Sequence, residues 1–127
     1  MGQLHVIFGD VAEVRKGKDN LLPKAMKKLN RFILKHYSDD QGLVAFEVDE
    51  YLVVAKKYAL RGIIVSAHTN AVLQAKELGK DLLMYIGEWD KFYAFHPQDI
   101  IDNGTRNTRG KSVFLNFDIK LGRESDV

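Results

Sequence analysis

The chain has 127 residues, which is enough for a single domain with one hydrophobic core. Its 46% hydrophobic and 28% charged residues exclude an intrinsically disordered protein, and no apolar run approaches the roughly 18 residues of a membrane span. Cysteine is absent, which excludes disulfides and thiolate–metal sites, and the net charge of +2 indicates no particular class of partner.

The first ten residues, MGQLHVIFGD, lack the basic and long apolar regions of a signal peptide. We therefore expect a cytoplasmic protein with no membrane association. No repeat, low-complexity tract or linker interrupts the sequence, so we expect one domain, residues 1–127.

Positive charge is unevenly distributed along the chain. Eight basic residues and a single acid, Asp19, lie between Arg15 and Lys35. A second basic cluster, TRNTRGK, lies in a stretch rich in Gly and Asn and contributes Arg106, Arg109 and Lys111. Segregated positive charge is typical of a phosphate-binding surface, but it is equally typical of a solvated helix face, and charge alone leaves both interpretations open.

The first predicted elements are a short strand over residues 4–8, LHVIF, and a helix over residues 21–37. Asp19 or Asn20 can cap this helix, and Pro23 lies in its first turn, where a missing N–H costs nothing. Apolar residues recur at helical spacing, and Phe32 widens their stripe. The basic residues fall largely off that stripe and form a basic outer face: Lys24, Lys27, Lys28, Arg31 and Lys35.

A β-hairpin is predicted next, because the β-rich runs GLVAFEV and YLVVAKKYA flank the pair Asp49–Glu50. Side chains alternate between the two faces of a strand, so Ala55 and Lys57 share one face while Lys56 lies on the other. At most one of the two adjacent lysines can therefore serve a given site.

The remaining segments predict further α and β elements in alternation. RGIIV is a short extended piece. In SAHTNAVLQAKELG, Ser66, Thr69 or Asn70 can cap a helix that runs through Leu78 and stops at Gly79. DLLMYI and KFYAF form a second hairpin around a turn at residues 87–90, HPQDII begins a short helical turn or loop, and SVFLNFDIKL is a last strand after the basic loop. The order predicts an α/β sandwich with a mixed, mainly antiparallel sheet.

This order of elements resembles a known family. A basic helix precedes a hairpin that ends in a lysine-bearing strand, and a short apolar piece, a helix, a buried strand and the strand KFYAFHPQDI follow. The arrangement resembles the restriction-endonuclease-like, or PD-(D/E)xK, fold, and is most similar to the archaeal Holliday-junction resolvases. The resemblance covers roughly residues 20–101 and rests on order and hydrophobic pattern rather than on a strong motif.

The resemblance implies a metal-dependent chemistry. In that family, an acid at the start of one hairpin strand and a Glu on the next hold Mg²⁺ or Mn²⁺, which polarises the scissile phosphate, and a Lys two residues after the Glu stabilises developing charge. By position, Lys57 is the candidate catalytic lysine, and Asp40 or Glu47 are the candidate metal ligands. An active chain would be a divalent-metal-dependent endodeoxyribonuclease, a phosphodiester hydrolase, working as a homodimer.

The sequence departs from the family pattern at three places. Ala55 stands where the Glu of Glu-x-Lys is expected, the preceding strand opens with Gly42–Leu43 instead of an acid, and the helix over residues 21–37 contains no acid. These departures favour binding over cutting. We therefore predict a DNA-binding protein on a resolvase-like nuclease scaffold with a degenerate or altered active site, contacting nucleic acid through a set of basic residues: Lys24, Lys27, Lys28, Arg31, Arg106, Arg109 and Lys111.

Two alternatives remain open at this point. The same fold can serve as a non-catalytic protein-interaction or structural subunit, with the basic helix contacting an acidic partner. The segment YALRGIIV…GKDLLMYIG also resembles the catalytic domain of archaeal tRNA-splicing endonucleases, although the Gly-x-Lys-Phe-Gly element of that family is absent. The four histidines show no metal-ligand spacing, and no Gly-rich phosphate loop is present.

Overall fold

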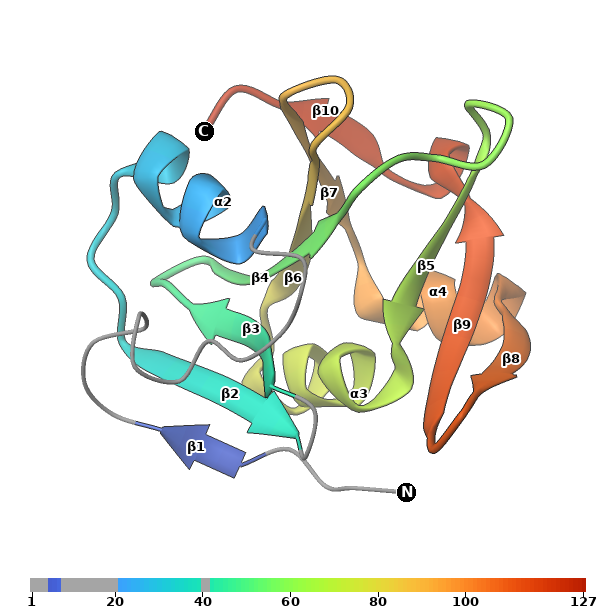
Figure 1. Cartoon of the computed structure of the whole chain (residues 1–127), viewed down its shortest axis with the longest axis horizontal. Coiled ribbons are helices and arrows are strands. Elements are labelled where there is room, and N and C mark those ends of the chain that lie inside the picture. Colours follow the sequence, from blue (N-terminus) through green and yellow to red (C-terminus); the bar gives the residue numbers. More distant parts are fainter. Residues whose placement is uncertain (1–4, 8–20, 40–41) are drawn as a thin grey trace.

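The larger of two β-sheets forms the centre of the protein (Figure 1). The structure, a computed structural model, describes residues 5–7, 21–39 and 42–127. The strands of the larger sheet are ordered β1 (His5–Ile7), β2 (Lys35–Asp39), β3 (Gly42–Glu47), β4 (Tyr51–Lys56), β6 (Asp81–Ile86), β7 (Lys91–Phe95) and β10 (Arg123–Ser125). Among these described strands, only β4 and β6 run parallel; the other neighbouring pairs are antiparallel, so the sheet is mixed.

The smaller sheet is antiparallel and contains three strands in the order β5 (Ile64–His68), β9 (Ser112–Asp118) and β8 (Thr105–Arg109). The helices are α2 (Leu21–Leu29), α3 (Thr69–Leu78) and α4 (Pro97–Asn103), and a short 3₁₀ helix, η1, spans Ile119–Leu121. A parallel pair needs a long crossover, and here the chain passes through β5 and α3 between β4 and β6. Helix α3 consequently contacts strands of both sheets.

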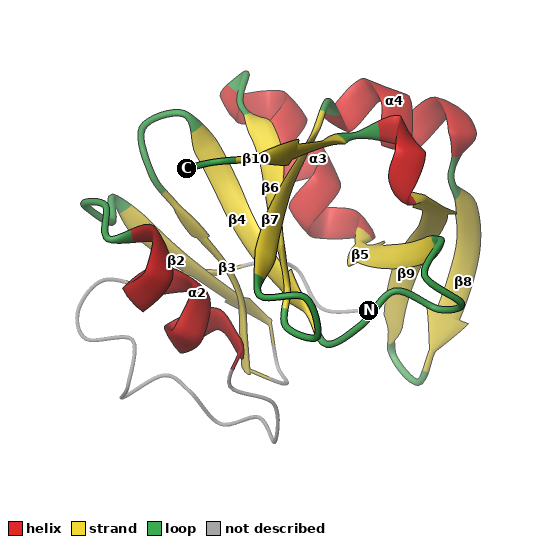
Figure 2. Ribbon diagram, turned by 90° about the horizontal axis from the view of Figure 1, so that it is seen from above, coloured by secondary structure: helices red, strands yellow, loops and turns green. Residues whose placement is uncertain are grey.

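Helices α2 and α3 cover opposite faces of the larger sheet (Figure 2). Alternation along β4 explains the two cores: Val53 packs with Leu22 and Ala25 of α2, whereas Leu52 packs with the α3 side of the sheet. This confirms the predicted division of the β4 side chains between two faces. It also confirms the α/β class, with helices on both sides of a mixed sheet.

The helix predicted over residues 21–37 is wrong beyond Leu29. Asn30 adopts a left-handed conformation (φ 52°), and its N–H donates to the carbonyl oxygen of Met26 at 3.0 Å. Asn tolerates this conformation better than most residues, so it ends the helix as a C-terminal cap. The chain then becomes strand β2, and Phe32, which was assigned to the apolar stripe, is 81% exposed.

Most of the other predicted elements are confirmed. Gly79 ends α3 with a left-handed φ of 70°, its N–H and that of Lys80 donating back to the last turn of the helix. The hairpin turns at residues 49–50 and 87–90 are present, as is the short helix after His96. The segment predicted as a basic loop is instead strand β8, paired with β9 in a hairpin.

Candidate functional site

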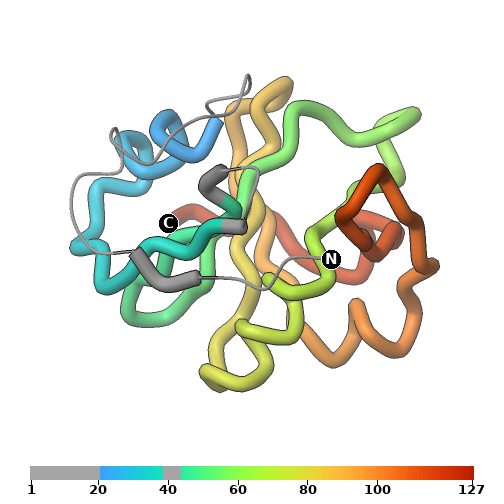
Figure 3. Tube along the Cα trace, turned by 60° about the horizontal axis from the view of Figure 1, so that its bottom comes forward, coloured from blue at the N-terminus to red at the C-terminus, as the bar shows by residue number. Residues whose placement is uncertain are grey.

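Strand β4 ends between the two adjacent lysines. Lys56 is its last residue, and from Lys57 onward the chain leaves the larger sheet and crosses to β5 in the smaller one (Figure 3). The first part of this crossing is fixed by the β6–β7 turn, because the N–H groups of Gly87 and Glu88 donate to the carbonyl oxygens of Lys56 and Lys57 at 2.8 and 2.9 Å. The junction, residues 56–58 at the end of β4, is therefore hydrogen-bonded through the backbone of both lysines to the β6–β7 turn.

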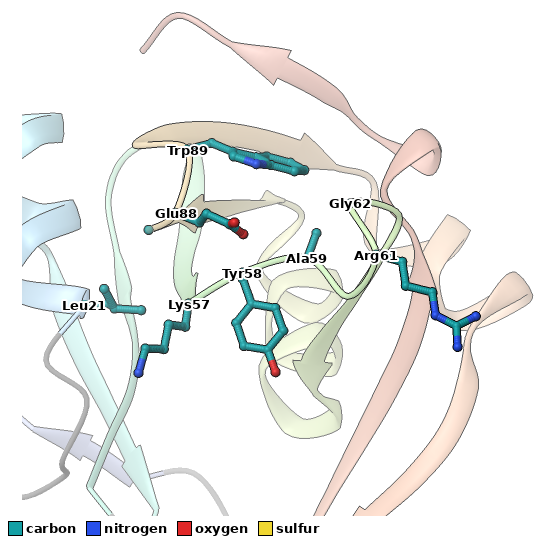
Figure 4. A pocket seen from close by; sticks show the side chains of 9 residues that line it. Leu21, Lys57, Tyr58, Ala59, Arg61, Gly62, Glu88 and Trp89 are labelled. Carbon is teal, nitrogen blue, oxygen red and sulfur yellow. The ribbon is translucent and has the colours of Figure 1, made fainter.

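An open pocket of about 660 Å³ lies beside this junction (Figure 4). Its described lining comes from the start of α2, the segment between β4 and β5, and the β6–β7 turn: Leu21, Lys57, Tyr58, Ala59, Arg61, Gly62, Gly87, Glu88 and Trp89. The wall is mainly apolar, with Trp89 and Glu88 on the turn and Lys57 and Tyr58 on the facing segment. Arg61 extends away from these two side chains, toward the smaller sheet.

The aromatic residues of this pocket differ in how firmly they are held. Trp89 is half-buried and its ring lies 5.9 Å from that of Tyr93, so it forms part of the hydrophobic core as well as of the pocket wall. Tyr58 is 49% exposed and follows the exposed Lys57 directly. An exposed ring beside a cation can stack a flat group while the ammonium neutralises a negative charge.

The structure does not bring Lys57 and the described candidate metal ligand together. Glu47 lies opposite Leu52 in the β3–β4 register, which places it on the α3 side of the sheet. Lys57 lies two residues after Ala55, which packs on the α2 side, and lines a pocket together with Leu21 of α2. Asp40 lies outside the described residues.

The Glu47 carboxylate is already engaged by two donors. The Tyr37 hydroxyl donates to it at 3.0 Å, and the Lys80 ammonium forms an ion pair with it and also donates to the Val48 carbonyl oxygen at 2.7 Å. Burial favours the neutral acid, but the hydrogen bonds from Lys80 and Tyr37 outweigh it, so the pKa of Glu47 lies below its ordinary value. Burial and the bond to Glu47 raise the pKa of Tyr37 to about 12.

Mg²⁺ and Mn²⁺ prefer several oxygen ligands on one site. Within residues 5–7, 21–39 and 42–127, no three histidine, aspartate or glutamate side chains gather closely enough to hold a metal ion. The described residues around Lys57 therefore do not fit the divalent metal that the family resemblance implies, and no hydrolytic step can be built from them.

The predicted basic residues of the first helix region are exposed, but they differ in their partners. Lys28 donates to Asp90 at 3.0 Å, and Arg31 donates to Glu50 at 2.8 Å and lies over the Tyr51 ring at 5.9 Å. Lys24 and Lys27 form no ion pair within the described part of the chain.

The second basic group, Arg106, Arg109 and Lys111, lies on the exposed β8–β9 hairpin. Arg106 pairs in register with Leu115 and Arg109 with Ser112, so the two arginines lie on opposite faces of the smaller sheet. Helix α2 and β8 are at opposite ends of the molecule (Figures 1 and 2). The two basic groups therefore do not form one continuous surface.

Sequence reasoning selected Lys57 as a candidate but missed the pocket beside it, and it gave no functional role to Tyr58 or Trp89. A run of exposed residues after β4, including Arg61 at a left-handed φ of 55°, marks the crossing segment. No periodic pattern signals such a segment.

Comparisons with known proteins identify no relative. No family model matches the chain, no curated protein is significantly similar to it, and no solved structure matches it. None of the helices in the described part of the chain is long and apolar enough to cross a membrane.

Proposed function

We propose that this chain is a nucleic-acid-binding protein, with DNA as its ligand, built on a scaffold similar to that of the Holliday-junction resolvases. The observation that carries the proposal is the junction after β4, where Lys57 and Tyr58 are exposed at an open pocket of about 660 Å³. Leu21 of α2 lines the same pocket, so the basic helix borders it.

The chemistry of this junction suits unpaired nucleotides. An exposed aromatic ring can stack any base, because every base has a π face, and neighbouring cations neutralise the phosphates that follow. Lys57 and Tyr58 supply these two elements side by side, and Lys24 and Lys27 add positive charge on the adjoining helix. We infer that single-stranded or branched DNA binds here in preference to a continuous duplex.

The scaffold part of the proposal is supported by the order of elements. A basic helix precedes antiparallel strands that end at a lysine, a second helix crosses the opposite face, and a strand parallel to β4 follows. This is the order on which the resemblance to the resolvases rests. We propose binding without cleavage, and a homodimer as the working form, because the resolvases that the scaffold resembles usually work as symmetric dimers.

Trp89 provides a direct test, because it is the only tryptophan in the chain and lines the pocket. We expect its fluorescence to change on titration with single-stranded or four-way DNA, with an affinity that falls steeply as salt increases. Unchanged fluorescence with no mobility shift at low salt would contradict the proposal.

Variants of the junction sharpen this test. Tyr58→Ala should weaken single-stranded DNA binding about tenfold, the order expected for one stacked base, and Lys57→Ala should reduce both the affinity and the salt slope. The matched control is Lys76→Ala, an exposed lysine on α3 that does not line the pocket. Equal losses in all three variants would indicate only diffuse charge.

Incubation with Mg²⁺ or Mn²⁺ tests the absence of cleavage. We expect the native chain to leave duplex, single-stranded and four-way DNA intact. Ala55→Glu restores Glu-x-Lys and is the variant with which weak cleavage would first appear. Cutting by the native chain, lost in Lys57→Ala, would instead assign the phosphodiester hydrolase activity.

A second candidate, a protein-interaction module, is favoured by one observation. Leu60 and Ile63, in the same crossing segment, are 53% and 45% exposed. Neighbouring exposed apolar side chains are typical of an interface with another protein. If Leu60→Asp changes the mass of the particle in solution while DNA binding is absent in every variant, the interaction module is the better description.

A further inference from the structure

A smaller cavity, of about 110 Å³, opens on the other side of the β4–β5 crossing segment. Its described lining comes from the end of β4, the crossing segment and the smaller sheet: Lys56, Tyr58, Leu60, Ile64, Val65, Ser66, Arg109 and Asn116. The two adjacent lysines therefore line two different hollows, Lys57 the larger and Lys56 the smaller.

Two buried polar atoms in this cavity have no hydrogen-bond partner among the described residues, the Ser66 hydroxyl oxygen and the Asn116 side-chain carbonyl oxygen. Ser66 is only 6% exposed, and it lies directly opposite Asn116 in the β5–β9 register. Cross-strand neighbours lie on the same face of a sheet, so both groups face the same space. Buried polar groups are nearly always paired, which means that this pair requires a partner inside the cavity.

The charged groups of the cavity are cationic. Arg109 lies over the ring of Phe114, 5.2 Å from its centroid, a cation–π contact that favours this placement of its side chain. An arginine guanidinium presents a pair of N–H groups that match two oxygens of a phosphate or carboxylate. Lys56 adds a second positive charge, and none of the described lining residues is acidic.

The volume of the cavity exceeds the needs of one water molecule. A water occupies roughly 30 Å³ in the liquid, so the observed 110 Å³ accommodates a small polyatomic anion. Leu60, Ile64 and Val65 form the apolar part of the cavity wall.

We propose that this cavity is a binding site for a phosphate-type oxyanion, either free phosphate or a phosphate group carried by a larger molecule. Arg109 supplies the guanidinium that binds the anion, and Lys56 adds to the positive charge of the cavity lining. The Ser66 hydroxyl donates to one oxygen, and the Asn116 amide, turned so that its NH₂ faces the cavity, donates to another. The proposal does not depend on nucleic-acid binding at the larger pocket.

Two variants of strand β8, Arg109→Gln and Arg106→Gln, form a matched pair that tests the phosphate site. Both arginines are exposed and carry the same charge, but only Arg109 lines the cavity, and Arg106 lies on the opposite face. Inorganic phosphate is titrated into each full-length protein by calorimetry at constant ionic strength, with chloride as the competing anion. Arg109→Gln should weaken phosphate binding about tenfold or more, and Arg106→Gln less than about twofold.

Ser66→Ala is the second variant, because it removes a hydroxyl without adding bulk. It should weaken phosphate several-fold while leaving the unfolding transition in place. Absence of phosphate binding to the native chain, or equal losses in Arg106→Gln and Arg109→Gln, would overturn the proposal and indicate that the cavity holds only water.

A second arm distinguishes the source of the phosphate. A short single-stranded DNA without terminal phosphates is titrated into the same variants, with Trp89 fluorescence as the readout. If Arg109→Gln weakens phosphate but not this DNA, the ligand is a free or terminal phosphate; if it weakens both, the cavity takes a backbone phosphate. Either result supports the site, and DNA binding can fail altogether without affecting the phosphate arm.

Discussion

Two carboxylates, one on each side of the larger sheet, each accept from a tyrosine hydroxyl and a lysine ammonium but differ greatly in burial. Glu47, on the α3 side, accepts from the Tyr37 hydroxyl and the Lys80 ammonium. Asp90, in the β6–β7 turn beside α2, accepts from the Tyr85 hydroxyl and the Lys28 ammonium. The Glu47 side chain is 7% exposed and that of Asp90 is 66% exposed.

Burial decides what an ion pair contributes to the stability of the fold. Water can replace either partner of Asp90, so the Lys28–Asp90 pair links α2 to the turn but contributes little stability. Glu47 has no such replacement, and loss of a partner leaves a buried charge uncompensated. The same reasoning explains why Glu47 behaves as a structural residue in spite of its carboxylate.

The largest expected effect is that of Lys80→Met, which removes the ammonium and keeps the aliphatic stem. It should lower the free energy of unfolding by about 3 kcal/mol, because Glu47 remains buried without its cation. Urea unfolding measures this, with Lys28→Met as the matched control. The control should show a much smaller loss that shrinks further as salt is added. Similar losses in the two variants would remove the distinction between the pairs.

Removal of the two phenol hydroxyls gives an intermediate effect. Tyr37→Phe should cost about 1–2 kcal/mol of stability, since it takes a donor from a buried carboxylate that keeps Lys80. Tyr85→Phe, which takes a donor from an exposed carboxylate, should cost less. Thermal or urea unfolding of both variants provides the comparison, and a larger loss for Tyr85→Phe would reverse it.

The smallest effect is the dependence of stability on pH. The pKa of Glu47 in the folded protein lies below its ordinary value of 4.5, so the folded state stabilises the ionised carboxylate. The resulting stabilisation is present above pH 4.5 and is lost as the pH falls through the folded pKa. Unfolding measured between neutral pH and acid should therefore show a shallower decline in Glu47→Gln than in the native chain, and identical slopes would contradict the assignment.

Local signals in the sequence predict much of the fold. Gly79 marks the end of α3 because its left-handed φ of 70° favours glycine. The Asp49–Glu50 pair marks its turn as a polar break between two β-rich runs. The helix over residues 21–37 was overextended because the helical spacing continues through Ile33, although Asn30 already ends the helix. Residues 35–39 form a strand because they pair between β1 and β3, and strand pairing depends on residues far away in the sequence.

The candidate sites were less accessible to sequence reasoning. The alternation of β4 correctly separated Lys56 from Lys57, because side-chain period follows from strand geometry alone. The partners of these lysines come from segments that are far apart in the sequence, such as Trp89 for one and Asn116 for the other. Only the crossover between two sheets brings them together, and no spacing rule encodes that.

Tyr58 lines both the larger pocket and the smaller cavity. A ligand that changes the position of this ring on one side therefore alters the wall that a ligand meets on the other. For the two proposed ligands, thermodynamic linkage makes such coupling reciprocal: the factor by which phosphate changes DNA affinity equals the factor by which DNA changes phosphate affinity. In the proposed two-site protein, a single exposed side chain thus makes one binding event conditional on the other.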